Sequence, residues 1–210
     1  AMNLVANMSS PNFNYNNWLK GIYENDTKNV KKALTYFSKS FSMFPFSQDL
    51  IYFGPLHLGP ANLLYLNKTN YKATMVGLPF DDIKSWNTKL SDLEFINSFK
   101  KIVKVWEKGI NLLPANSLNQ NTQELLRYAE VFYVNCKSAI NQYNFVLNRA
   151  NKDIINRLID SELELTLKLY KLASIDSKIG FEASNQYLYS QNNFIEKILN
   201  LFNLKNDIIK

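Results

Sequence analysis

The sequence predicts an all-α fold, an antiparallel helical bundle of about five to six helices with one long irregular insertion at about 45–91. Several long segments place apolar residues three or four positions apart, which is the spacing of one helix face. Two of these segments open with a capping-box pattern, in which a polar residue is followed three positions later by Glu. Four of the six prolines lie in the insertion, where they prevent a long helix.

The first part of the chain predicts two helices. Apolar residues at helical spacing indicate a short helix at 15–23. Asp26 then offers a cap for a second helix at about 27–44, which ends before Pro45.

The insertion that follows contains Gly as well as Pro, and only its 71–78 stretch has extended character. Irregular stretches of this length in a compact domain usually form a functional site or an interface.

The second half begins with two strongly marked helices. A capping box at 91–94 opens a helix that ends at Pro114, and a second box at 121–124 opens one that runs to Arg149. In each box the side chains at both ends bind free backbone N–H groups of the first turn.

Two further amphipathic helices are expected at about 152–173 and 191–203, with a polar and aromatic loop at 174–190 between them. We therefore expect residues 1–210 to form a single helical domain that contains no catalytic barrel.

The composition excludes several classes of site. The single cysteine, Cys136, forms no intrachain disulfide, and with only one histidine, His57, the chain cannot build a Cys₄ or Cys₂His₂ metal site. Phosphate-binding glycine loops and the common nucleophile motifs are also missing. No cofactor and no metal are expected.

The net charge of +6 does not indicate nucleic-acid binding, because the basic residues are spread along the chain and only three of the 24 are Arg. The sequence has neither a signal-peptide pattern nor a run of 18 apolar residues. We expect no nucleic-acid partner, no membrane association and a cytoplasmic location.

Four residues of the insertion are candidate ligand or interface residues. His57 lies between two Gly-Pro pairs, a rigid loop that can present an imidazole or bind it to backbone carbonyls. Asp81, Asp82 and Trp86 can contact a sugar, because carboxylates accept hydrogen bonds from hydroxyls and an indole face covers the apolar side of the ring. The alternative is a helix cap at Asp82.

Glu162 lies within the apolar stripe of the helix at 152–173. A buried carboxylate must be paired or protonated. We expect an ion pair with Arg149, Arg157 or Arg127, and the alternative is a catalytic acid.

The loop at 174–190 supplies three further candidates, Glu182, Asn185 and Tyr187. They belong to the densest polar and aromatic cluster of the chain. The alternative is a loop whose side chains satisfy its own backbone.

Five stretches together resemble the C-terminal helical region of large bacterial glycoside-hydrolase-like proteins. In order they are FPF at 44–46, YFGPLHLGPANLLY at 52–65, ATMVGLPFDDIKSW at 73–86, WEKG at 106–109 and DSKIGFEASNQY at 176–187.

The resemblance implies a helical domain that packs beside a (β/α)₈-type catalytic barrel, for which this chain has no room. It implies an accessory domain of a carbohydrate-active protein, not catalytic alone, with a barrel-type partner and carbohydrate as a ligand. The 45–91 and 174–190 segments would then share one concave or apolar face. The resemblance assigns no catalytic residue.

Two other functions stay open. One is a protein-interaction module whose irregular segment binds a partner. The other is a small stand-alone hydrolase with a carboxylate pair drawn from Asp81, Asp82, Glu162 and Glu182.

Overall fold

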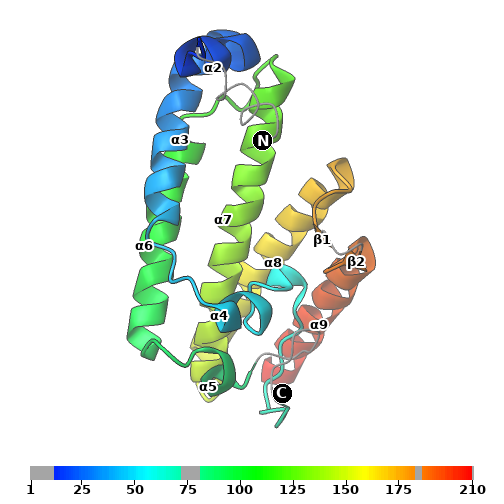
Figure 1. The fold of residues 1–210 in the computed structure, drawn as a ribbon. Coiled ribbons are helices and arrows are strands. Elements are labelled where there is room, and N and C mark those ends of the chain that lie inside the picture. The colour runs from blue at the N-terminus through cyan, green and yellow to red at the C-terminus, as the bar shows by residue number, and fades with distance from the viewer. Residues whose placement is uncertain (1–11, 72–80, 183–185, 210) are drawn as a thin grey trace.

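The fold is a row of long helices in which each packs against the next along the chain (Figure 1). A computed structural model describes residues 12–71, 81–182 and 186–209. Its long helices are α3 (Thr27–Phe41), α6 (Asp92–Ile110), α7 (Gln120–Leu147), α8 (Lys152–Ile175) and α9 (Gln191–Ile209). The predicted all-α bundle is confirmed.

Short elements precede α3 and occupy connections between the long helices. They are α2 (Tyr15–Tyr23), the 3₁₀ turns η1 (Glu24–Asp26) and η2 (Gly59–Ala61), α4 (Gln48–Tyr52), α5 (Ile83–Trp86) and the paired antiparallel strands β1 (Phe181–Glu182) and β2 (Gln186–Tyr187). Three of these short elements, α4, η2 and α5, lie inside the predicted insertion. Among the described residues, none of the helices is long and apolar enough to cross a membrane.

Helix α7 lies between the α3–α6 side and the α8–α9 side of the molecule (Figure 1). It supplies at least one side chain to each of the four apolar clusters of the described core. Those side chains are Ala129, Val134, Cys136, Ala139, Tyr143 and Phe145. The core is therefore arranged along both flanks of this helix.

The insertion crosses α7. Leu50 of α4 packs in the cluster formed with α6, whereas Ala61 of η2 packs in the cluster formed with α8 and α9. The irregular segment thus contacts both sides of the bundle.

Polar side chains fix the starts of the helices. The capping box at Ser91 is confirmed, since Ser91 Oγ accepts from the Glu94 amide at 3.3 Å and the Ser91 amide donates to Glu94 Oε2 at 2.9 Å. The predicted box at 121–124 is wrong, because Asn119 caps α7 by accepting from the Thr122 amide at 3.0 Å. Asn119 Nδ2 also donates to the Ile22 carbonyl, which ties this cap to α2.

The ends of the helices differ more from prediction. Helix α3 stops at Phe41, because the amides of Met43 and Phe44 turn back to carbonyls three residues earlier. Helix α9 continues beyond 203, since Leu204 and Ile208 remain buried.

Two further predictions concern the loop at 174–190 and the extended stretch at 71–78. Helix α8 and the short hairpin occupy part of the predicted loop at 174–190. The extended stretch predicted at 71–78 lies outside the described residues after Tyr71.

Candidate functional site

An apolar groove of about 590 Å³ opens between the end of α3, α4, the loop after α4 and α7. It is lined by Phe41, Phe44, Phe46, Ile51, Tyr52, Leu56, His57, Tyr128, Val131, Phe132, Asn135, Cys136 and Leu188. Its size is in the range of ligand-binding pockets. We call this feature the groove.

Both irregular segments reach the groove. The insertion contributes residues from Phe46 to His57, and the second segment contributes Leu188, which follows β2. The two segments therefore meet at one apolar groove, but the second segment supplies Leu188 alone among the described residues, and of the predicted polar and aromatic set the described lining includes His57.

Exposed aromatic rings form part of the groove. Phe46 is 76% exposed and Phe41 is 58% exposed. The ring centroids of Phe41 and Phe132 lie 6.3 Å apart, and Phe132 contacts Trp106 with centroids 4.1 Å apart. Apolar side chains gathered in a concave surface favour an apolar occupant.

None of the described residues that line the groove is Asp, Glu, Lys or Arg. The Tyr128 hydroxyl donates to Asp176 Oδ2 at 3.0 Å, and burial together with this carboxylate raises the pKa of Tyr128. Burial also raises the pKa of the Cys136 thiol, so it remains protonated and is a poor nucleophile. The described lining of the groove therefore carries no carboxylate, ammonium or guanidinium group, and the imidazole of His57 is its one basic side chain.

Of the predicted site residues whose side chains the structure describes, only His57 lines the groove. Trp86 is 2% exposed, with its ring centroid 5.7 Å from those of Phe95 and Tyr143. Because its ring is packed in the core, Trp86 is not available as a platform for a sugar.

Asp81 holds the chain together locally. It accepts from the Thr69 amide at 2.9 Å and from the Thr69 hydroxyl at 2.7 Å, and it pairs with Arg149 at 2.9 Å. Burial alone would raise the pKa of Asp81, but the Thr69 donors and Arg149 lower it below its ordinary value. All three partners stabilise the ionised carboxylate.

Asp82 precedes α5 at the predicted cap position, where its carbonyl, not its carboxylate, accepts from the Ser85 hydroxyl at 2.7 Å. Glu182 and Tyr187 lie on β1 and β2, and Asn185 lies outside the described residues. The predicted residues thus do not form one site among the described part of the chain.

Glu162 is fully buried, and the predicted structural ion pair is confirmed with a different partner. Its Oε2 lies 3.5 Å from Nζ of Lys197, which is also fully buried. The expectation of Arg149, Arg157 or Arg127 is wrong, because α9 packs along α8 and brings Lys197 to this position.

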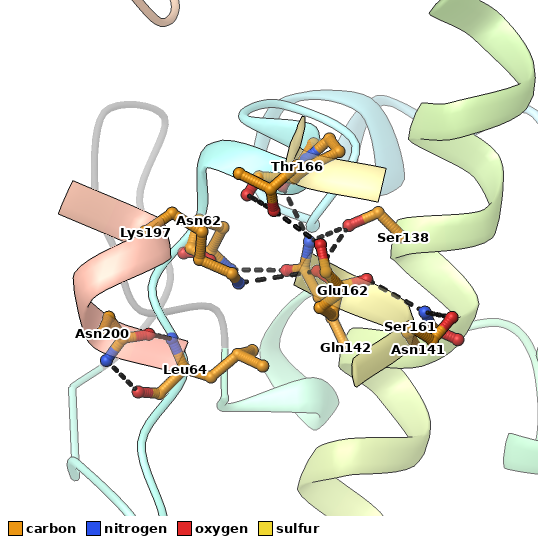
Figure 2. A network of polar contacts seen from close by, with 12 residues as sticks. Asn62, Leu64, Ser138, Asn141, Gln142, Ser161, Glu162, Thr166, Lys197 and Asn200 are labelled. Carbon is orange, nitrogen blue, oxygen red and sulfur yellow. Dashed lines mark hydrogen bonds and ion pairs between the residues drawn. The ribbon is translucent and has the colours of Figure 1, made fainter. Parts of the chain in front are cut away.

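Two neutral donors complete the surroundings of Glu162 (Figure 2). Ser138 Oγ donates at 2.9 Å and Asn141 Nδ2 at 3.1 Å. Burial raises the pKa of Glu162, opposed by the Lys197 ammonium and these two donors, and burial lowers the pKa of Lys197 to about 8. Since the pair has no access to solvent, it does not carry out general acid–base catalysis on a substrate.

Sequence reasoning missed Lys197, although a signal was present. Lys197 follows Phe194 by three positions and precedes Leu201 by four, so it lies within the apolar face of α9. The same argument that identified Glu162 applies to it.

Comparison with protein-family models, curated proteins and solved structures found no match for this chain. Among the described residues, no group of three or more His, Cys, Asp or Glu side chains is arranged to hold a metal ion. The groove and the buried polar network around Glu162 are therefore the features on which a function must be argued.

Proposed function

We propose that this chain is a binding module, not an enzyme, and that its groove binds an uncharged apolar segment of a partner protein. One observation carries the proposal: the groove is lined by aromatic and aliphatic side chains, two of them strongly exposed phenylalanines, with no Asp, Glu, Lys or Arg among the described residues that line it. Exposed apolar surface of this kind is costly in water and is stabilised when a partner covers it.

The carboxylates support a binding role over hydrolysis. A glycosidase needs two carboxyl groups facing one open cleft. Asp81 is engaged by Thr69 and Arg149, and Glu162 is buried beside Lys197. Neither lines the groove.

The resemblance to glycoside-hydrolase-like proteins supplies the class of partner. In this proposal the chain is a helical accessory domain, and the occupant of the groove is an apolar segment on the surface of a barrel-type catalytic protein. We place both in the bacterial cytoplasm, where a single free thiol is the ordinary state of cysteine.

Carbohydrate is a second candidate ligand. The observation that favours it is that the lining of the groove includes the exposed ring of Phe46 together with two side chains that can hydrogen-bond to hydroxyls, Tyr52 and His57. Aromatic faces stack on the apolar side of sugar rings. The scarcity of polar groups in the groove makes this ligand second to an apolar protein segment.

The test compares peptides with glycans. Uncharged 12-residue peptides with Leu and Phe three or four positions apart are titrated by calorimetry, alongside the same peptides with Ser at the apolar positions. A glycan panel is titrated in parallel, and each mixture is assayed for hydrolysis.

Variants locate the binding surface. Phe46→Ser removes a side chain of the groove, and Phe202→Ser removes a comparably exposed aromatic ring on α9, outside the groove. We expect binding of the apolar peptides only, weakened at least about tenfold by Phe46→Ser and unchanged by Phe202→Ser. Glycan binding in the groove would favour the second candidate, and hydrolysis by the chain alone would refute a binding role.

A further inference from the structure

The turn at 59–62 is held by side chains from three helices at once (Figure 2). Its backbone carbonyls at three positions face side-chain donors of three different helices. Gln142 Nε2 of α7 donates to the Gly59 carbonyl at 2.8 Å, and Lys197 Nζ of α9 donates to the Asn62 carbonyl. Thr166 Oγ1 of α8 lies 3.4 Å from the Pro60 carbonyl, as the longer branch of a hydrogen bond shared with a carbonyl of its own helix.

Glu162 connects these donors to one another. It pairs with Lys197, accepts from Ser138, and its own backbone carbonyl accepts from the Thr166 hydroxyl at 2.7 Å. Ser138 Oγ in turn accepts from Gln142 Nε2 at 2.8 Å. The three donors thus belong to one buried network with this carboxylate at its centre.

The turn leads directly into a wall of the groove. The Gly59 amide donates to the Pro55 carbonyl at 2.9 Å, and the His57 amide donates to the Gly54 carbonyl at 3.1 Å. Leu56 and His57, which lie between these bonds, line the groove. Residues 54–59 therefore form consecutive tight turns. Because these turns are short and hydrogen-bonded, the position of Gly59 determines the position of the wall.

Gly59 also contacts the groove directly, through the side chain of a lining residue on α7. Its φ is +52°, and a Cβ at this position would lie 1.8 Å from Oδ1 of Asn135, another groove residue. Because the turn touches Asn135 here, a shift of the turn would also displace this side chain of the groove.

We propose that the buried Glu162–Lys197 pair is a positioning device for the groove, which fixes the 59–62 turn and thereby the wall formed by Leu56 and His57. This inference rests on the proposed binding function. A buried ion pair adds little net stability compared with a well-packed apolar pair. A charged donor aimed at a backbone carbonyl, however, selects one position of the turn, which an apolar contact does not.

The test replaces the pair by apolar residues of similar volume, Glu162→Leu with Lys197→Met, so that no charge remains buried. Ile208→Ala is the control, because it removes a buried side chain of α9 in a different apolar cluster. The probe is the apolar dye 1-anilinonaphthalene-8-sulfonate, with its site in the wild type located by loss of binding in Phe46→Ser.

His57 gives a second readout, because it is the only histidine and its imidazole C–H signals in NMR report on the wall alone. We expect the double variant to remain folded, to bind the dye at least about tenfold more weakly and to show shifted His57 signals. Ile208→Ala should change neither the affinity for the dye nor the His57 signals.

The two proposals fail in different ways. A wild type that does not bind the dye in the groove would overturn the proposed function. Wild-type binding that the double variant retains within about twofold, with unchanged His57 signals, would overturn the positioning role alone. If the double variant does not fold, Thr166→Val is measured instead, since it removes the hydroxyl that contacts the Pro60 and Glu162 carbonyls while both charges of the pair remain, and the same two readouts are compared with those of the wild type.

Discussion

Glu162→Leu on its own should destabilise the protein strongly, because it leaves the Lys197 ammonium buried without a counter-charge. Once Glu162 is gone, the Lys197 ammonium keeps its hydrogen bond to the Asn62 carbonyl but has no carboxylate beside it among the described residues. Removal of one partner of a buried pair costs about 3–5 kcal/mol. Lys197 can avoid this cost only by losing its proton.

The free energy needed to remove the proton from Lys197 sets an upper limit on the loss of stability. Each pH unit below the ordinary lysine pKa of 10.5 costs about 1.4 kcal/mol, which amounts to about 5 kcal/mol at pH 7. We therefore expect the free energy of unfolding to fall by about 3–5 kcal/mol at pH 7.

The protonation of Lys197 also determines how the stability of the variant changes with pH. If the variant folds with a neutral Lys197, the unfolded state binds one proton more than the folded state below pH 10.5. Stability then rises with pH, by up to about 1.4 kcal/mol per unit. In the wild type the pKa of Lys197 is lowered only to about 8, so this rise should begin near that pH and not below it.

Urea unfolding followed by circular dichroism at pH 7, 8 and 9 measures both effects. The matched control is Glu164→Leu, which removes an exposed carboxylate two positions along the same helix and should change stability by less than about 0.5 kcal/mol. Addition of Lys197→Met to Glu162→Leu should recover most of the loss.

Two results would contradict this reasoning. Wild-type stability in the Glu162→Leu variant at pH 7 would show that the carboxylate is exposed in solution. A loss that is the same at pH 7 and pH 9 would show that Lys197 does not lose its proton in the variant.

Three further predictions concern single residues. Gly59→Ala should lower the free energy of unfolding by about 1–3 kcal/mol in thermal denaturation, because Ala is strained at a φ of +52° and meets the Asn135 side chain. Asp81→Asn should destabilise the protein at neutral pH through loss of the Arg149 pair, and the difference from wild type should vanish in acid unfolding below the lowered pKa of Asp81, where the native carboxyl is protonated too. Tyr189 should still be protonated at pH 11, because burial raises its pKa to about 12, and a Tyr189→Phe variant should show unchanged tyrosinate absorbance at that pH.

The helices could be predicted well because their apolar period and the Ser91 cap are local signals. Their ends could not, since they depend on tertiary contacts. Helix α7 starts at Gln120 because Asn119 also binds the carbonyl of Ile22, almost a hundred residues away. No pattern within α7 itself reveals that bond.

The candidate site was predicted only in part. The Pro and Gly content of the insertion indicated an interface, and His57 does line the groove. The apolar spacing along their helices does not distinguish Phe41 and Phe132 from core residues, because an apolar residue on a helix face has the same pattern whether or not another element covers it. Trp86 shows the converse, since an aromatic residue of the Pro- and Gly-containing insertion is almost completely buried against the long helices.

The place of α7 between two sets of helices has a consequence for how the protein unfolds. Each of the four apolar clusters loses a side chain if α7 melts, so neither flank keeps a complete core without it. Local unfolding of another helix leaves α7 folded. Unfolding of α7, in contrast, disrupts the apolar clusters on both of its sides. Its backbone amides should therefore exchange with solvent only through global unfolding, and the two flanks should behave as one cooperative unit. The groove residue Cys136 and the network residue Ser138 lie on this same slowly opening helix, so the groove floor and the network are lost together or not at all.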